Sequence, residues 1–295
     1  MNAIKDRLDI PIIYTVHTLE RKEEYGHMSP LEYLTRCAIQ EALINISDRI
    51  IALSNYERDL LVEYYPKTLA RIRVVGNGII CSADSATRVK NKYKADSNNT
   101  NTVLYVGRFI SRKGIQDLLE AIPIVIHRLP RTKFLLVGGE PGVTPLELRK
   151  KWLPAKLSPY QNQIIFKGWL NELELQKMYE LADVLVVPSR YEPFGLVILE
   201  GMSHGLPVVA SSVGGPLEVI EHGRTGFLFP VKNIQAFSYY LIYLLKNPDI
   251  RQQMGESALK QVHQKWQWTQ IAEKVQDIYQ EILLNRSVAD RIEVC

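Results

Sequence analysis

The sequence is poor in cysteine and has no long apolar run, and both absences narrow what the protein can be. Its three cysteines, Cys37, Cys81 and Cys295, are widely spaced and form no CxxC pair. An odd number at such spacing argues against a disulfide framework or a zinc site and for a reducing compartment. No apolar stretch reaches the ~18 residues of a membrane span, and the opening MNAIKDRLDIP lacks the apolar core of a signal peptide. We therefore predict a cytoplasmic protein.

Strong charge of one sign is also missing. Of the 295 residues, 23% are charged, but the formal net charge is only +4. Nucleic-acid binding would need the basic residues gathered on one face, so we predict no nucleic-acid partner. The mild positive charge suits an anionic small molecule or a weak peripheral contact with an anionic membrane. No GxxxxGK[ST] occurs, which excludes a P-loop, and no D-x-D pair occurs that could hold a metal.

What the sequence does contain is a regular series of short apolar runs. They are rich in Val, Ile and Leu with little alternation, as expected of strands covered on both faces of a parallel sheet. The predicted strands are 11–16, 49–53, 72–75, 102–106, 133–137, 163–166, 184–188, 207–210 and 226–229.

Helical segments with clear start signals lie between these runs. The stretches Ser29-Pro30-Leu31-Glu32, 54–57 and 144–147 each place a hydroxyl three residues before a glutamate, which is the pattern of a capping box. Alternation of strands and helices predicts an α/β fold with parallel sheets.

The organisation along the chain suggests two domains of unequal completeness. Residues 1–81 offer about three strands, as in the C-terminal part of a Rossmann-like domain whose opening strands are absent. The polar stretch 82–101 is a predicted linker or surface loop. Residues 102–264 form a predicted second Rossmann-like domain. A final helix over about 265–285 opens with two tryptophans that need a surface to bury them, and 286–295 form a tail.

The first motif with chemistry is VGRFISRKG, residues 106–114. Gly107 permits a tight turn after a strand, and Arg108 and Lys113 lie in the loop before the next helix. Ligands of open α/β sheets bind at this carboxyl edge, where two cations suit a pyrophosphate. The alternative is two solvated surface cations.

The second motif is EPFGLVILE, residues 192–200. Pro193 disfavours helix for Glu192, and a short helix begins near Gly195 and ends before Gly205. Its first amides favour an anion. A carboxylate on either side of a bound phosphate could hold two hydroxylated groups, as in a nucleotide sugar. Alternatively, Glu192 only faces the helix dipole and Glu200 is a solvated helix residue.

The third motif is SSVGGPLEVIEHGRTGFLF, residues 211–229. Gly214-Gly215 would let the backbone approach a ligand closely, and Glu218 follows. A plain turn between a strand and a helix is the alternative.

Together these motifs resemble the retaining glycosyltransferases of the GT-B fold, family 4, over residues 10–284. Glu192 and Glu200 match the family's E-x7-E motif. The resemblance implies two Rossmann-like domains facing across a cleft, with the final helix crossing back to the first domain. His17 matches a family histidine near the sugar, although a strand-end histidine alone is more often structural. The segment HTLERK, which ends at Lys22, is similar to the branch of the family that contains sucrose-phosphate synthases and mycothiol glycosyltransferases.

The resemblance also implies roles for individual residues. Arg108 and Lys113 would bind the donor diphosphate and stabilise the leaving group, and Glu192 would contact the transferred sugar. The backbone of Gly107, Phe194, Gly195, Leu196 and Val197 would line the donor, and Glu200 would bind the ribose diol. We expect transfer to an acceptor hydroxyl with retention and without a metal, a cofactor or a covalent nucleophile, because fixed cations and amides stabilise the departing phosphate.

The chain departs from the family at its start, where the family has further strands and a glycine-rich loop. A fragment, a natural truncation and a split enzyme whose partner chain supplies those strands stay open. We expect little transfer by this chain alone. A nucleotide-sugar-binding module and a GT-B sugar-nucleotide epimerase are the alternative functions. The sugar, the base and the acceptor, whether a sugar, a sugar phosphate or a lipid-linked sugar, are not identified by the sequence.

Overall fold

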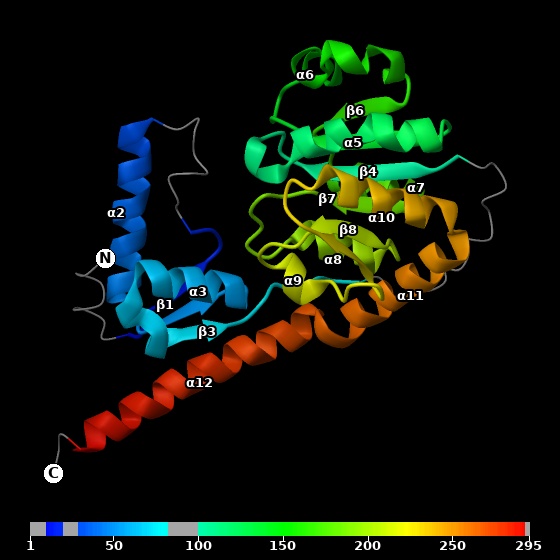
Figure 1. The fold of residues 1–295 in the computed structure, drawn as a ribbon. Coiled ribbons are helices and arrows are strands. Elements are labelled where there is room, and N and C mark those ends of the chain that lie inside the picture. The colour runs from blue at the N-terminus through cyan, green and yellow to red at the C-terminus, as the bar shows by residue number, and fades with distance from the viewer. Residues whose placement is uncertain (1–9, 20–28, 82–99, 293–295) are drawn as a thin grey trace. The chain divides into compact units, whose positions relative to one another are not determined.

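The computed structural model describes residues 10–19, 29–81 and 100–292. The chain divides into two compact units. The first contains Met1–Gly78 together with Trp268–Cys295, and the second contains Ile79–Gln267. Most of the predicted linker, residues 82–99, lies outside the described residues, as does Lys22. Figure 1 gives the labels of the elements in each unit.

The first unit is built on a three-stranded parallel sheet of order β1-β2-β3. Buried aliphatic side chains from the strands, from α2 and from α3 form its core, with Val16, Ile44, Ile50 and Leu61 fully buried. Its elements before the second unit are β1 (Ile13–Val16), α2 (Pro30–Ile46), β2 (Arg49–Ala52), α3 (Asn55–Tyr64), the 3-10 helix η2 (Pro66–Arg71) and β3 (Ile72–Val74).

The first unit also contains the last helix, α12 (Trp268–Ile292). The prediction that the helix ends near 285 is wrong, since its hydrogen-bonded turns continue to Ile292. Glu281 of α12 accepts from Arg49 at 2.9 Å and from Arg73. These ion pairs, together with the buried Ile278 and Ile282, attach the helix within the unit.

The second unit is a six-stranded, all-parallel sheet of order β6-β5-β4-β7-β8-β9. The apolar runs found in the sequence form these strands, and their Val, Ile and Leu side chains are buried because helices cover both faces. The strands are β4 (Thr102–Gly107), β5 (Lys133–Gly138), β6 (Ile164–Gly168), β7 (Val184–Val187), β8 (Val208–Ser211) and β9 (Gly226–Phe229). The predicted α/β fold with parallel sheets is confirmed.

The helices of the second unit lie on both faces of the sheet (Figure 1). α5 packs beside α10 on one face, and α8 packs on β7, β8 and α11 on the other. The helices are η3 (Ser111–Lys113), α5 (Ile115–Arg128), α6 (Pro145–Trp152), η4 (Ala155–Tyr160), α7 (Glu172–Leu181), α8 (Leu196–Ser203), α9 (Pro216–Val219), α10 (Ile234–Lys246) and α11 (Pro248–Lys265).

A hydroxyl caps each of the three predicted helix starts, and the structure records the complete capping box at Thr144. The hydroxyls of Ser29, Ser54 and Thr144 each accept the backbone amide three residues on, which satisfies an otherwise unpaired donor. At Thr144 the Glu147 carboxylate returns the bond and completes a capping box. None of the helices within the described ranges is both long and apolar enough to cross a membrane.

The two tryptophans near the last helix differ from expectation. Trp266 does not open the helix: it ends α11, and its ring packs edge-on against Phe194 with centroids 5.4 Å apart. Trp268 does begin α12 but is 46% exposed, so the expectation that both rings are buried is wrong. The backbone and ring of Trp268 instead lie against Gly78, where a Cβ would come within 2.8 Å of the Trp268 Cα.

Candidate functional site

The motifs VGRFISRKG and EPFGLVILE meet at one place in the second unit. The first follows β4 and the second follows β7, and these two parallel strands are hydrogen-bonded neighbours. The chain proceeds outward from β4 toward β6 in one direction and from β7 toward β9 in the other. Such a reversal of strand order is the topological switch point, and ligands of open α/β sheets bind at the carboxyl edge there.

The hydroxyl of a buried tyrosine in β4 forms hydrogen bonds with the loop that follows this strand. The buried Tyr105 hydroxyl donates to the carbonyl of Arg108 at 3.0 Å and is also 3.4 Å from the carbonyl of Lys113. Burial raises the pKa of Tyr105, and the negative charge of Glu192 raises it further. A neutral phenol therefore fixes both ends of the cationic loop, a role that the sequence analysis missed because Tyr105 lies within an ordinary apolar strand.

The loops after β4 and β7 are joined to each other. The Arg190 amide donates to the Arg112 carbonyl at 2.8 Å, and its guanidinium pairs with the buried carboxylate of Asp117. Gly114 has φ +66°, and a Cβ there would lie 1.8 Å from the carbonyl oxygen of Pro188. Only glycine permits this approach, so the two loops form one rigid edge.

An ion pair lies at the centre of this edge. The Lys113 ammonium is 2.6 Å from the Glu192 carboxylate, and the same oxygen accepts the Ser189 hydroxyl at 3.0 Å. Glu192 is 5% exposed, and a carboxylate is rarely so buried without a paired charge. The structure therefore brings two predicted site residues together, but as partners of each other.

Arg108 differs from Lys113 in its surroundings. Its side chain is exposed at the end of β4, and only its carbonyl has a described hydrogen bond. The alternative of a solvated cation thus fails for Lys113, which has a buried partner, whereas Arg108 is an exposed cation.

The short helix α8 begins beside this pair. Gly195 is its N-cap with φ +92°, and Leu196 and Val197 form its first turn. Helix starts leave amides without an intrahelical partner, and these amides favour an anion. The helix ends as predicted, with Gly205 in the left-handed region at φ +67°.

The glycines of the third motif contact protein and not open space. A Cβ on Gly214 would lie 2.0 Å from the carbonyl oxygen of Glu192, and one on Gly215 would lie 2.2 Å from that of Phe194. The Gly215 amide donates to the Glu192 carbonyl at 2.9 Å. The close approach predicted for a ligand is made instead by the Glu192 loop, which contacts these glycines through its backbone and Trp266 through the ring of Phe194.

Glu200 lies in a separate cluster. Its carboxylate accepts the Tyr179 hydroxyl at 2.5 Å, and the Tyr179 ring stacks on His204 with centroids 5.1 Å apart. Burial and the charge of Glu200 raise the pKa of Tyr179. Tyr179 orients the carboxylate from α7, which the spacing of the two glutamates could not reveal.

His17 belongs to the first unit. It is exposed and directly follows β1, and its carbonyl accepts the Thr18 hydroxyl at 2.7 Å. Its predicted position near the sugar stays a prediction. In the described ranges, no three His, Cys, Asp or Glu side chains gather closely enough to hold a metal ion.

Comparison with protein families gives two matches. The model described as Glycosyl transferases group 1 matches residues 87–261. The model described as Glycosyltransferase Family 4 matches residues 1–82. The first match covers more than half of the chain and includes the loops after β4 and β7.

Individual relatives are similar over nearly the whole chain. The glycogen synthase of Mycobacterium tuberculosis (strain H37Rv) is 28% identical over 279 residues, which are 94% of this chain and 64% of the relative. The D-inositol 3-phosphate glycosyltransferase of Corynebacterium glutamicum (strain R) is 29% identical over 296 residues, covering 97% of this chain and 70% of the relative. The chain thus spans about two thirds of the length of such relatives.

Solved structures have the same fold. The sucrose-phosphate synthase from Thermosynechococcus elongatus superposes with a TM-score of 0.74 at 25% identity, covering 96% of this chain and 71% of that chain. Anabaena Alr3699/HepE in complex with UDP-glucose superposes with a TM-score of 0.75 at 20% identity, covering 95% and 74%. These likenesses support the GT-B fold.

Proposed function

Because the chain belongs to the glycosyl transferases group 1 family, we propose that it transfers a sugar from a nucleotide-diphosphate-sugar donor to an acceptor hydroxyl. The observation that carries the proposal is the Lys113–Glu192 pair beside Arg108 at the switch point between β4 and β7. A cation, a carboxylate and a helix start converge at the edge where a diphosphate and its sugar would lie.

Lys113 can serve the donor without leaving Glu192. An ammonium has three N–H donors, and one of them is occupied by the carboxylate. The others are available to a phosphate oxygen. Glu192 would in turn accept from a sugar hydroxyl with its second oxygen. The Lys113–Glu192 pair would then position both the diphosphate and the sugar, the two groups joined by the bond that breaks.

The chemistry follows from where charge develops. Cleavage of the anomeric bond builds negative charge on the leaving diphosphate and positive character on the sugar. Lys113, held by Glu192, and the amides of Leu196 and Val197 are fixed before the reaction and would stabilise the first charge together with Arg108. Glu192 would lie on the side of the second charge. We propose that the configuration is retained by attack on the same face, with the leaving phosphate helping to take the acceptor's proton, and that no metal is needed.

Glu200 is proposed to bind the ribose diol. Tyr179 occupies one of its oxygens, which leaves the other to accept from a hydroxyl. The UDP-glucose complex of Alr3699/HepE makes uridine the first base to test.

The test is calorimetry of the purified chain with UDP, GDP and ADP, followed by their glucose conjugates. We expect binding of at least one diphosphate. No binding by a chain with a native circular-dichroism spectrum would remove the donor site from this edge.

Product analysis then separates the reaction classes. NMR of the product formed from an α-linked donor should give an α-glycoside with retention, and chelation by EDTA should leave the rate unchanged. Epimerised donor sugar without transfer would identify an epimerase. Donor binding without either product, also in the presence of a partner chain that supplies the further N-terminal strands, would identify a binding module.

A further inference from the structure

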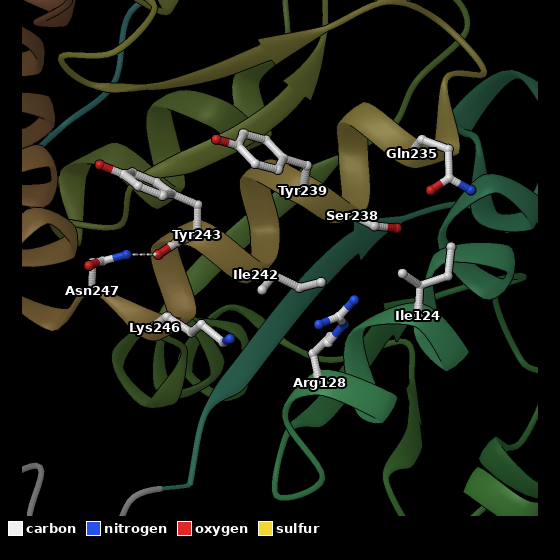
Figure 2. A pocket seen from close by; sticks show the side chains of 9 residues that line it. All are labelled: Ile124, Arg128, Gln235, Ser238, Tyr239, Ile242, Tyr243, Lys246 and Asn247. Atoms are coloured by element: carbon white, nitrogen blue, oxygen red, sulfur yellow. Dashed lines mark hydrogen bonds between the residues drawn. The ribbon is translucent and has the colours of Figure 1, made fainter.

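A hollow lies in the second unit, away from the edge described above. It has a volume of about 390 Å³ and runs between α5 and α10. α5 starts at the carboxyl end of β4 and ends at Arg128, shortly before β5 begins. Arg128, which lines the hollow, is therefore at the opposite edge of the sheet from Lys113. Figure 2 shows the side chains of Ile124 and Arg128 projecting from α5 toward α10.

The floor of this groove contains an unusual polar group. Ser238 of α10 is 1% exposed, and its buried hydroxyl has no hydrogen-bond partner in the described part of the chain. A helical serine can usually bond to the carbonyl one turn earlier, and a buried hydroxyl without a partner is destabilising. Figure 2 places Ser238 on the side of α10 that faces Ile124, so a bound molecule could supply the missing partner.

The walls combine cations with aromatic rings. Arg128 and Lys246 are exposed, and no carboxylate lines this hollow. Neither forms an ion pair with any described residue. Tyr239 is 64% exposed, and its ring runs nearly parallel to that of Tyr243, with centroids 6.5 Å apart at 18°. Helix dipoles explain cations at the ends of α5 and α10, but they explain neither the hydroxyl nor the tyrosines.

The groove also continues along α5. A neighbouring hollow of about 600 Å³ shares Ile124 and Gln235 with the first and extends to Lys156 and Tyr160. It therefore adds another cation and another tyrosine, together with the exposed carboxylate of Glu120 on α5. An extended groove with repeated cation and tyrosine pairs suits a ligand longer than a single small ion.

We propose that the groove between α5 and α10 binds an acidic oligosaccharide, a short chain of sugars carrying carboxylate or phosphate groups. The apolar face of a sugar ring would pack on the tyrosines, its hydroxyls would bond to Ser238 and Gln235, and its anionic groups would pair with Arg128 and Lys246. A flat bilayer surface could meet the cations but could not reach the hydroxyl at the floor. The proposal goes beyond the donor site and does not depend on it.

The experiment is a set of titrations of the full chain by calorimetry and saturation-transfer NMR. The probes are trigalacturonate, glucose 6-phosphate, maltotriose and inorganic phosphate. We expect trigalacturonate to bind at least about tenfold more tightly than maltotriose, than phosphate and than the single acidic sugar glucose 6-phosphate. Arg128→Ala/Lys246→Ala should remove this preference. The matched control, Lys150→Ala/Lys177→Ala, removes two exposed cations from α6 and α7 and should keep it, as should Arg108→Ala at the donor edge.

Ser238→Ala distinguishes a ligand contact from a structural residue. It should weaken binding of the acidic saccharide several-fold without lowering the melting temperature, because the hydroxyl stabilises nothing in the free protein. Equal binding of all four probes, or unchanged binding in Arg128→Ala/Lys246→Ala, would overturn the proposal. Binding only to vesicles of anionic phospholipid, lost in that double variant, would replace the oligosaccharide with a membrane surface.

Discussion

Replacing a lysine that pairs with a buried carboxylate should affect both ligand binding and stability. Replacing the exposed Arg108 should affect binding alone, so the two variants separate the effects. Lys113 neutralises Glu192, which is 5% exposed, whereas Arg108 is exposed. Arg108→Ala should weaken diphosphate binding by about 10- to 150-fold, corresponding to ~1.5–3 kcal/mol for a charge-assisted contact, and leave the melting temperature unchanged. Lys113→Ala should weaken binding similarly and also lower the melting temperature, because Glu192 loses its cation.

The double variant Lys113→Ala/Glu192→Gln serves as the control. Removing both charges should restore much of the lost stability but none of the diphosphate affinity. Glu192→Gln alone should weaken binding of the nucleotide sugar more than binding of the bare diphosphate. Equal loss for both ligands would show that Glu192 acts through the loop and not on the sugar. Calorimetry and thermal unfolding measure both quantities.

Tyr179 offers a second test at the scale of one hydroxyl. Tyr179→Phe removes the donor that orients Glu200 but keeps the ring stacked on His204. If Glu200 binds the ribose diol, the change should weaken the preferred nucleoside diphosphate several-fold. The 2′,3′-dideoxy analogue should bind weakly to both proteins, without a difference between them. A similar loss for both ligands would assign Tyr179 a purely structural role.

At the scale of elements, the position of the Glu192 loop depends on close backbone contact. Gly214 and Gly223 both have positive φ, at +65° and +80°, but a Cβ would meet the Glu192 carbonyl at 2.0 Å only in the first case. Gly223→Ala should therefore cost about 1 kcal/mol from backbone strain alone. Gly214→Ala should cost clearly more and abolish nucleotide binding, as measured by urea unfolding and calorimetry. Equal losses of stability and binding in the two variants would mean that the Glu192 loop can move to make room for the added Cβ.

The elements were more predictable from the sequence than the contacts between them. Runs of Val, Ile and Leu identify the strands, because a strand covered on both faces has few other compositions available. The edge where Arg108 and Glu192 lie also follows from strand order and loop position. The Lys113–Glu192 pair, the bond from Tyr179 to Glu200 and the packing of Trp266 on Phe194 do not follow, because each joins residues distant in sequence whose side-chain directions depend on tertiary packing.

At the scale of the whole molecule, the attachment of α12 should depend on pH. Hydrogen bonds from Arg73, and then from Arg49, lower the pKa of Glu281. The stability they confer is present above the unfolded value of ~4.3 and is lost as the pH falls through the lower folded pKa. Glu281→Gln should cost at most about 1 kcal/mol per pair at pH 7, and this difference from the wild type should shrink below pH 4.

Glu273→Gln provides the control for this titration. Glu273 is an exposed residue of the same helix for which the described contacts include no ion pair. Its substitution should leave thermal unfolding unchanged from pH 7 to pH 3.5. A Glu281→Gln deficit that stayed constant over that range would show that the side chain acts by packing and not by charge.

The chain leaves the first unit after Gly78 and returns to it at Trp268, so a change in α12 should act on the first unit and spare the proposed nucleotide site. Ile278 is 5% exposed, and Ile278→Asp would bury an unpaired carboxylate at a cost of several kcal/mol. We expect a new low-temperature unfolding step with unchanged binding of the preferred nucleoside diphosphate, because Arg108, Lys113 and Glu192 all lie in the second unit. Gln276→Asp, at an exposed position of α12, should unfold like the wild type. Loss of nucleotide binding together with the first step would show that the two units unfold as one.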